Sequence, residues 1–314
     1  PVIMSNPQIA AIICTHNRDR YLGDAIESLL AQEGVNYEVL IVDNGSTDQT
    51  KEVVAPFLSK SQVRYVYEPI LGLSVARNRG AEETTAPILA YLDDDAIASS
   101  QWLRVLVDAY EQKEKLAIAG GKVTLIWPDK ITPPTWISEG LAGALGAYDL
   151  GDKVISITNP QLTPRGLNYS LRRSFLEKIG GFDANLGRVG KKLLSNEELF
   201  MTELALNQGW EVFYLPEALV AHNVAPERLQ RSWFLSRSWW QGVSECYREE
   251  IAGRTGIKQL GRGGERLIRG LYKSLKYLGN SAESFDNLVY AYGQIGYLKE
   301  ALQLLVKPSQ SPKK

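Results

Sequence analysis

Short apolar runs alternate with amphipathic stretches along the first part of the chain. Apolar runs bounded by polar residues predict buried strands at Ile9–Cys14, Tyr37–Val42, Val63–Tyr67, Pro87–Leu92 and Leu116–Val123. Apolar residues at helical spacing predict intervening helices at Tyr21–Gln32, from Ser46 or Thr47 to Leu58, at Leu73–Glu83 and at Ser100–Gln112. This alternation is typical of an α/β fold with a doubly wound, mainly parallel sheet flanked by helices.

The pattern changes after the fifth predicted strand. The segment from Trp127 to Asp152 is rich in Pro, Gly and Trp, which predicts long loops. Patterned structure then resumes, with elements predicted at Gly166–Phe182, Leu199–Gln208 (helix), Trp210–Leu215 (strand), Pro226–Ile251 and Glu265–Leu278 (helices). We therefore expect an α/β domain over residues 1–226 and a basic, aromatic helical extension over residues 227–314.

Composition narrows the classes of protein that fit. The chain has 314 residues, of which 44% are hydrophobic and 23% are charged, as in ordinary globular proteins. The net charge of −1 gives no overall field for nucleic acid, so no nucleic-acid partner is expected. Cys14 and Cys246 are too few for a disulfide framework, which favours a reducing, cytoplasmic compartment. No apolar run of membrane-spanning length and no signal peptide is apparent.

Polar residues gather where three predicted strands end, in CTHNRD, VDNGSTD and LDDDA. In doubly wound sheets, ligands bind outside the carboxyl ends of the strands. If the strand pattern continues through the acidic triplet, Asp93 and Asp95 share a face and Asp94 points away. Carboxylates at a strand end suit Mg²⁺ or Mn²⁺. A solvated acidic turn is the alternative interpretation of the triplet taken alone.

Two common nucleotide sites are disfavoured. The sequence contains no GxxxxGK[ST] loop, and THNRDRYLG follows the first strand where a dinucleotide fold has GxGxxG. These observations argue against a P-loop NTPase and against a dinucleotide-dependent dehydrogenase. They leave a nucleotide site built from acids and a divalent metal.

Six segments, in order, resemble a family 2 glycosyltransferase with the GT-A fold. They are CTHNRDRYLGDAIESLLAQ, YEVLIVDNGSTDQT, LGLSVARNRG, LAYLDDDA, GLNYSLRRSFLEKIGGFDANLGR and NEELFMTELALNQGWEVFYLPEALVAH. The resemblance covers roughly residues 8–226 and is greatest to bacterial and cyanobacterial enzymes of polysaccharide synthesis. It implies inverting, metal-dependent transfer of a sugar from a UDP-, GDP- or dTDP-linked donor to a glycan or lipid-linked acceptor.

The resemblance also implies roles for individual residues on the donor side. The implied nucleotide-sugar contacts are Thr15, Asn17, Arg18, Asp43, Arg77, Asn78, Asp93 and Asp94. Asp95 and Asp93 match the metal-binding acids of the family's DxD signature. His222 either completes the metal shell or is an ordinary structural histidine.

On the acceptor side, Asn196-Glu197-Glu198 stands where the family has a Glu-Asp pair at a helix start. Matching pair to pair makes Glu198 the catalytic base and Glu197 its neighbour, although both carboxylates also complement a helix dipole. Asn168 and Arg172 match segments that wall the donor sugar and the acceptor. Trp127 and Trp136 either stack on acceptor sugars or hold their loops by burial.

The basic residues are concentrated after residue 226. Residues 227–314 contain 15 basic and 8 acidic residues, a net charge of +7, against −8 for the rest of the chain. Basic helices with Trp suit an anionic membrane, here the inner face of the plasma membrane. A helical cap and a homodimer interface are the alternatives. For the whole chain, a nucleotidyltransferase and a non-catalytic polysaccharide- or partner-binding protein remain open beside the glycosyltransferase.

Overall fold

The computed structural model describes residues 6–129, 131–190, 192–254 and 256–306. These residues form two compact units. The sheet unit comprises residues 1–129, 145–184 and 197–224, and the helical unit comprises residues 130–144, 185–196 and 225–314. Two short segments from within the first 226 residues thus belong to the helical unit. Each unit is described by itself below.

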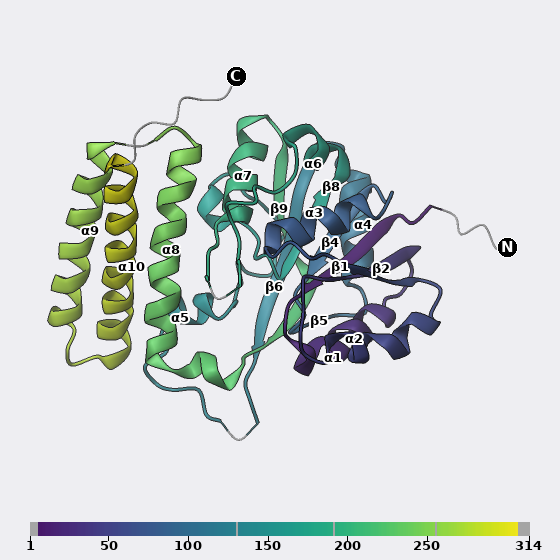
Figure 1. Cartoon of the computed structure of the whole chain (residues 1–314), viewed down its shortest axis with the longest axis horizontal. Helices are drawn as coiled ribbons and strands as arrows, with labels where there is room; N and C mark the ends of the chain where they lie inside the picture. Colours follow the sequence, from purple (N-terminus) through teal and green to yellow (C-terminus); the bar gives the residue numbers. More distant parts are fainter. Residues whose placement is uncertain (1–5, 130, 191, 255, 307–314) are drawn as a thin grey trace. The chain divides into compact units, whose positions relative to one another are not determined.

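The sheet unit is built on one nine-stranded sheet (Figure 1). Its strands are β1 (Ile9–Thr15), β2 (Tyr37–Asp43), β3 (Val63–Tyr67), β4 (Ile88–Leu92), β5 (Ala96–Ala98), β6 (Leu116–Ile126), β7 (Ile155–Ser156), β8 (Asn168–Arg172) and β9 (Glu211–Asn223). The order is β3-β2-β1-β4-β8-β6-β9-β5, and β7 pairs with β9. The first four strands are mutually parallel, which confirms the predicted doubly wound half. Sequence patterning missed that β8 runs antiparallel between β4 and β6.

Helices connect and cover these strands (Figure 1). They are α1 (Asp19–Leu30), α2 (Thr50–Val54), α3 (Leu73–Glu82), α4 (Trp102–Gln112), α6 (Arg173–Ile179), α7 (Glu197–Asn207) and the 3₁₀ helices Ala55–Ser59 and Pro160–Leu162. The helix predicted to run to Leu58 is divided, with a 3₁₀ helix that carries Pro56 in its first turn. Proline supplies no N–H for an α-helical hydrogen bond, so α2 stops before it.

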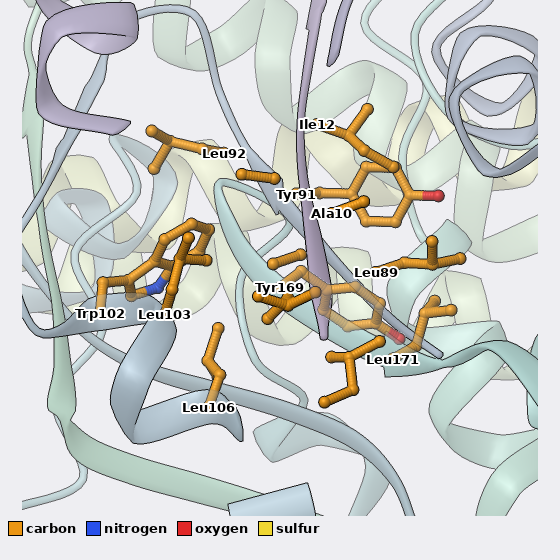
Figure 2. Packing of buried hydrophobic residues seen from close by; sticks show 14 of the residues in the cluster. Ala10, Ile12, Leu89, Tyr91, Leu92, Trp102, Leu103, Leu106, Tyr169 and Leu171 are labelled. Carbon is orange, nitrogen blue, oxygen red and sulfur yellow. The ribbon is translucent and has the colours of Figure 1, made fainter. Parts of the chain in front are cut away.

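In the sheet unit, one apolar cluster joins side chains of the strands with side chains of the helices that cover them. Figure 2 shows side chains from β1, β4, β8 and α4 gathered in one cluster. Within it, the indole N–H of Trp102 donates to Oδ1 of Asn168 at 2.8 Å, so a buried polar pair fixes α4 against β8. Helix α3 approaches β1 through Gly80, where an added Cβ would stand 2.7 Å from Cγ2 of Ile12. This close packing places the preceding turn of α3, with Arg77, at the sheet edge.

The helical unit contains three long helices that run side by side (Figure 1). They are α8 (Arg231–Ile251), α9 (Ile257–Lys276) and α10 (Ser281–Val306), accompanied by α5 (Glu139–Ala144) and the 3₁₀ helix Pro226–Leu229. Helix α9 begins eight residues before the predicted start at Glu265. In the part of the chain that the structure describes, no helix is long and apolar enough to cross a bilayer.

Candidate active site

The polar ends of neighbouring strands meet at one edge of the sheet, as predicted. Thr15 pairs with Asp43 at the ends of β1 and β2, and β4 pairs with β1 on the other side. The acidic triplet that follows β4 therefore emerges beside Thr15. Parallel strands with a shared carboxyl edge account for this convergence of residues that are distant in sequence.

Asp43 and Asn17 hold the loop that follows β2. Oδ1 of Asp43 accepts from the backbone N–H of Ser46 at 2.9 Å, and Oδ2 accepts from the Tyr65 hydroxyl at 2.6 Å. Asn17, in a left-handed conformation with φ of 51°, accepts from the backbone N–H of Thr47 at 2.7 Å. Both residues thus stabilise the loop at this edge of the sheet by hydrogen bonds within the protein.

The acidic triplet forms a turn, so the predicted strand alternation is wrong there. Strand β4 ends at Leu92, and the carbonyl oxygen of Asp93 accepts from the N–H of Ala96 at 3.1 Å. The turn places Asp94 and Asp95 beside the same guanidinium group. Nη1 of Arg18 forms an ion pair with Asp95 and lies 3.6 Å from Oδ1 of Asp94. Arg18 is therefore a partner of the acidic turn.

A very short strand, β5, pairs with β9 and so places His222 beside this turn. Strand β5 starts directly after Asp95 and pairs Ala96 with His222 of β9. As a result, Nε2 of His222 lies 3.0 Å from Oδ1 of Asp95, and both residues are almost completely buried (2% and 1% exposed). The predicted metal residues Asp95 and His222 are thus neighbours, although they are 127 positions apart in the sequence.

The charges at the turn can be tested for fit to a divalent cation. The carboxylates of Asp93, Asp94 and Asp95 all act electrostatically on the guanidinium of Arg18. Burial raises the pKa of Asp94 to about 7, with Arg18 opposing and the other two carboxylates adding to the rise. Among the described residues, no three His, Cys, Asp or Glu side chains are arranged as a complete metal site. The donor atoms and the excess negative charge nevertheless suit Mg²⁺ or Mn²⁺.

A second charged group lies on α3 and at the start of α7. Nη1 of Arg77 is 3.2 Å from Oε1 of Glu197 and 3.0 Å from Oε1 of Glu198, and its Nη2 donates to the carbonyl oxygen of Gly166 at 3.3 Å. The Arg77 side chain is only 2% exposed. Asp93 also raises the pKa of Arg77, so this group lies electrostatically close to the acidic turn.

The two glutamates differ in their protonation. Burial, reinforced by the charge of Glu198, raises the pKa of Glu197 to about 8. Burial also acts on Glu198, but Arg77 and a backbone N–H at the start of α7 outweigh it and hold the pKa of Glu198 below its ordinary value. The pKa values of the two carboxyl groups are therefore displaced in opposite directions, which favours a proton on Glu197 and a charge on Glu198. Such divergence within a pair is characteristic of acid–base sites.

Sequence patterning assigned no role to Arg165 and placed Gly166 only at the start of a family motif. An added Cβ on Gly166 would stand 1.8 Å from Oε1 of Glu198, so only glycine leaves room for the carboxylate. Arg165 lies over the ring of Tyr148 at 5.4 Å and within electrostatic range of Glu198. Its Nε is buried and has no hydrogen-bond partner among the described residues. The sequence signal was their position, with Arg165 directly before the GLNYS motif and Gly166 as its first residue.

Three residues that were predicted to contact the substrates form hydrogen bonds within the protein. Asn78 exchanges two hydrogen bonds with the backbone of Phe182, at 2.8 and 2.9 Å. Asn168 is fully buried and donates to the Ala218 carbonyl at 2.7 Å, in addition to its bond with Trp102. Arg172 pairs with Ile88, at the amino end of β4, and its guanidinium donates to backbone carbonyls at the end of α4 and just beyond it. The structure therefore does not bring Arg172 to the carboxyl edge.

The two tryptophans lie in different units. Trp127 is partly buried and directly follows β6 in the sheet unit. Trp136 belongs to the helical unit, where its ring lies 5.5 Å from Phe234 and 5.2 Å from Phe285, and the Arg231 guanidinium lies 5.3 Å from its centre. These contacts favour loop packing for Trp136, one of the two interpretations that the sequence left open.

Comparison with known proteins identifies the class that this fold and site define. The sheet arrangement is that of the GT-A glycosyltransferases. The mannosyltransferase PcManGT from Pyrobaculum calidifontis, solved in complex with GDP-Man and Mn²⁺, superposes with a TM-score of 0.56 at 16% identity, covering 96% of this chain and 74% of that chain. At this identity, the likeness speaks for the fold alone.

The sequence comparisons give the family. Residues 10–163 match the profile described as glycosyl transferase family 2. The chain is 29% identical over 244 residues to a glucosyl-dolichyl phosphate glucuronosyltransferase of Haloferax volcanii, covering 76% of each chain. It is 26% identical over 237 residues to the succinoglycan biosynthesis protein ExoM of Rhizobium meliloti, covering 73% and 71%. Residues 10–163 thus belong to glycosyl transferase family 2, and the chain is a glycosyltransferase, as its motifs predicted.

Proposed function

We propose that this chain transfers a sugar from a nucleoside diphosphate donor to a hydroxyl group of a glycan or lipid-linked acceptor, with inversion at the anomeric carbon and with a divalent cation. The observation that carries the proposal is the buried Arg77, which holds the carboxylates of Glu197 and Glu198 at 3.2 and 3.0 Å near the acidic turn. Relatives named for glycan synthesis and a structural neighbour with GDP-Man support this choice of substrates.

Glu198 is the residue that we assign as catalytic base. It is ionised at neutral pH, and its side chain is 16% exposed, against 5% for Glu197. The acceptor O–H gives its proton to the Glu198 carboxylate while its oxygen bonds to the anomeric carbon. The bond from that carbon to the diphosphate oxygen breaks on the opposite face, and its electron pair leaves with the diphosphate. Arg77 orients the pair, and the neutral Glu197 avoids a second buried negative charge.

Asp95, His222 and Asp93 are the residues that we assign to the cation. Their donor atoms are oxygen and imidazole nitrogen, and the turn carries more negative charge than Arg18 balances. When bound, a divalent cation offsets the negative charge on the departing nucleoside diphosphate. Arg18 already lies on the same carboxylate and contributes positive charge at this edge.

We assign the reaction to the sheet unit, because both charged groups lie within it. The helical unit is then an accessory part of the chain. The predicted division at residue 226 is close to the boundary at residue 224, and the segments 130–144 and 185–196 would belong to the accessory part.

The proposal is tested by incubating the full chain with UDP-, GDP- and dTDP-linked sugars and a panel of glycan and polyprenyl phosphate acceptors, with Mn²⁺ or with EDTA. We expect metal-dependent release of the nucleoside diphosphate and, by NMR, a product of inverted anomeric configuration. Glu198→Gln should lower kcat by about 10²- to 10⁴-fold, while Glu114→Gln, on an exposed site, should not change it. A retained configuration, or full activity of Glu198→Gln, would refute the assigned mechanism.

A further inference from the structure

The outward face of α9 carries a row of exposed apolar side chains. The row, which we call the α9 stripe, consists of Ile257, Ile268, Leu271, Tyr272 and Leu275. Successive members are spaced so that all lie on one side of an α-helix. The most exposed are Ile257 (79%), Ile268 (70%) and Leu275 (67%). Four of the five lie within two turns, at residues 268–275, and large apolar side chains this exposed mark a surface that meets an apolar phase.

The opposite face of α9 is already occupied by the helical unit itself. An added Cβ on Gly263 would stand 2.7 Å from Leu298, and one on Gly270 would stand 2.9 Å from Cβ of Ala291, both on α10. Gln259 is buried and donates to Glu249 of α8 at 2.8 Å. The helix is thus fixed by its inner face, and the α9 stripe is not needed for packing within the unit.

Cations line one side of the α9 stripe. Helix α9 contains six basic residues and one acidic residue, a net charge of +5. Five of the basic residues are exposed along the flank of the stripe, namely Lys258, Arg262, Arg269, Lys273 and Lys276. Arg262 contacts Glu249 at 3.1 Å. Among the described residues, Lys258, Lys273 and Lys276 have no carboxylate within ion-pair distance, so their charge is available to an external anion.

We propose that α9 lies flat on an anionic lipid bilayer, with the α9 stripe inserted at the headgroup boundary and the flanking cations on the lipid phosphates. A strongly amphipathic helix with low mean hydropathy and a cationic polar side has the character of an interfacial helix. Its 20 residues give a contact about 30 Å long. A second copy of this chain is a poorer occupant, because the same face would bring two helices of charge +5 together.

The surface is independent of the proposed transfer reaction, since every residue in it belongs to the helical unit. It therefore predicts membrane recruitment whichever sugar is transferred. A lipid-linked acceptor would lie in the same phase that α9 contacts.

The test is sedimentation of the full chain with vesicles of phosphatidylcholine alone and with added phosphatidylglycerol, at 0.05 and 0.5 M salt. We expect binding to the anionic vesicles at low salt, and loss of most of it at high salt, because screening shortens electrostatic range. Lys273→Gln/Lys276→Gln should weaken binding by about fivefold per cation removed. Ile268→Ser/Leu275→Ser should weaken it by about tenfold or more.

A matched control is Leu58→Ser/Val154→Ser, which removes two exposed apolar side chains (45% and 56%) from the sheet unit. This control should bind vesicles like the parent chain, and all variants should keep the parent's far-UV circular dichroism spectrum. Absence of binding to anionic vesicles at low salt would overturn the proposal. So would equal binding by the stripe variant, or a concentration-dependent dimer in analytical ultracentrifugation that the stripe variant abolishes without any vesicle binding.

Discussion

Replacing Glu197 by Gln tests whether the buried pair holds a proton at neutral pH. Gln has nearly the same shape as Glu and mimics its neutral form. The pKa of Glu197 is about 8 in the folded chain, against 4.5 for the free side chain. A carboxyl group whose pKa is raised on folding contributes its full stability below pH 4.5 and loses it as the pH rises to 8. Over that range, the parent chain should lose about 1.4 kcal/mol per pH unit through this group.

The measurement is the free energy of urea unfolding of the parent and of Glu197→Gln between pH 5.5 and 8. As the pH rises across this window, the free energy of unfolding of the variant should increase relative to that of the parent by about 3 kcal/mol, an order-of-magnitude value from the linkage of proton binding to folding. Titrating groups outside the Glu197–Glu198 pair, Asp94 among them, are present in both chains and cancel. Glu114→Gln, on an exposed site, should follow the parent curve. Parallel curves for parent and Glu197→Gln would show that the folded chain does not hold this proton and would remove the assignment of protonation states.

Three further changes probe the site. Gly166→Ala places a Cβ 1.8 Å from Oε1 of Glu198. It should therefore lower kcat at least about tenfold in the transfer assay and lower the free energy of urea unfolding by roughly 1–3 kcal/mol. The control Gly264→Ala, whose added Cβ faces open space, should change neither quantity. Arg165→Leu removes a buried Nε that has no hydrogen-bond partner among the described residues. We expect the free energy of unfolding to rise by about 1 kcal/mol and kcat/KM to fall. A lower free energy of unfolding would contradict this prediction. His222→Asn should weaken Mn²⁺ binding by about tenfold or more in calorimetry, and unchanged affinity would remove His222 from the cation site.

The sequence predicted most of the parallel half of the sheet because local pattern determines it. The observed strands β1 to β4 begin and end within one residue of the apolar runs that predicted them. Apolar runs of five or six residues between polar breaks leave little freedom of assignment. The family motifs then located the strand-end residues on the correct edge.

The rest of the site depends on contacts that no local pattern encodes. Strand β5 has three residues, too few to show a period, yet its pairing with β9 places His222 against Asp95. The acidic triplet was expected to continue a strand, but the chain turns at Asp93. Arg77 meets Glu198 across 121 positions of sequence. These outcomes follow from tertiary packing, which overrides short-range propensity.

The pairing of β5 with β9 has a consequence for the order in which the site can form during synthesis. Asp95 is translated well before the segment Glu211–Asn223, and its hydrogen bond from the N–H of Asn223 and its contact with His222 wait for that segment. A nascent or truncated chain that ends within the family match, at residue 163, holds the acidic triplet without its partner strand. The ribosome must therefore deliver the segment that carries His222 before Asp95 can meet its partners on β9.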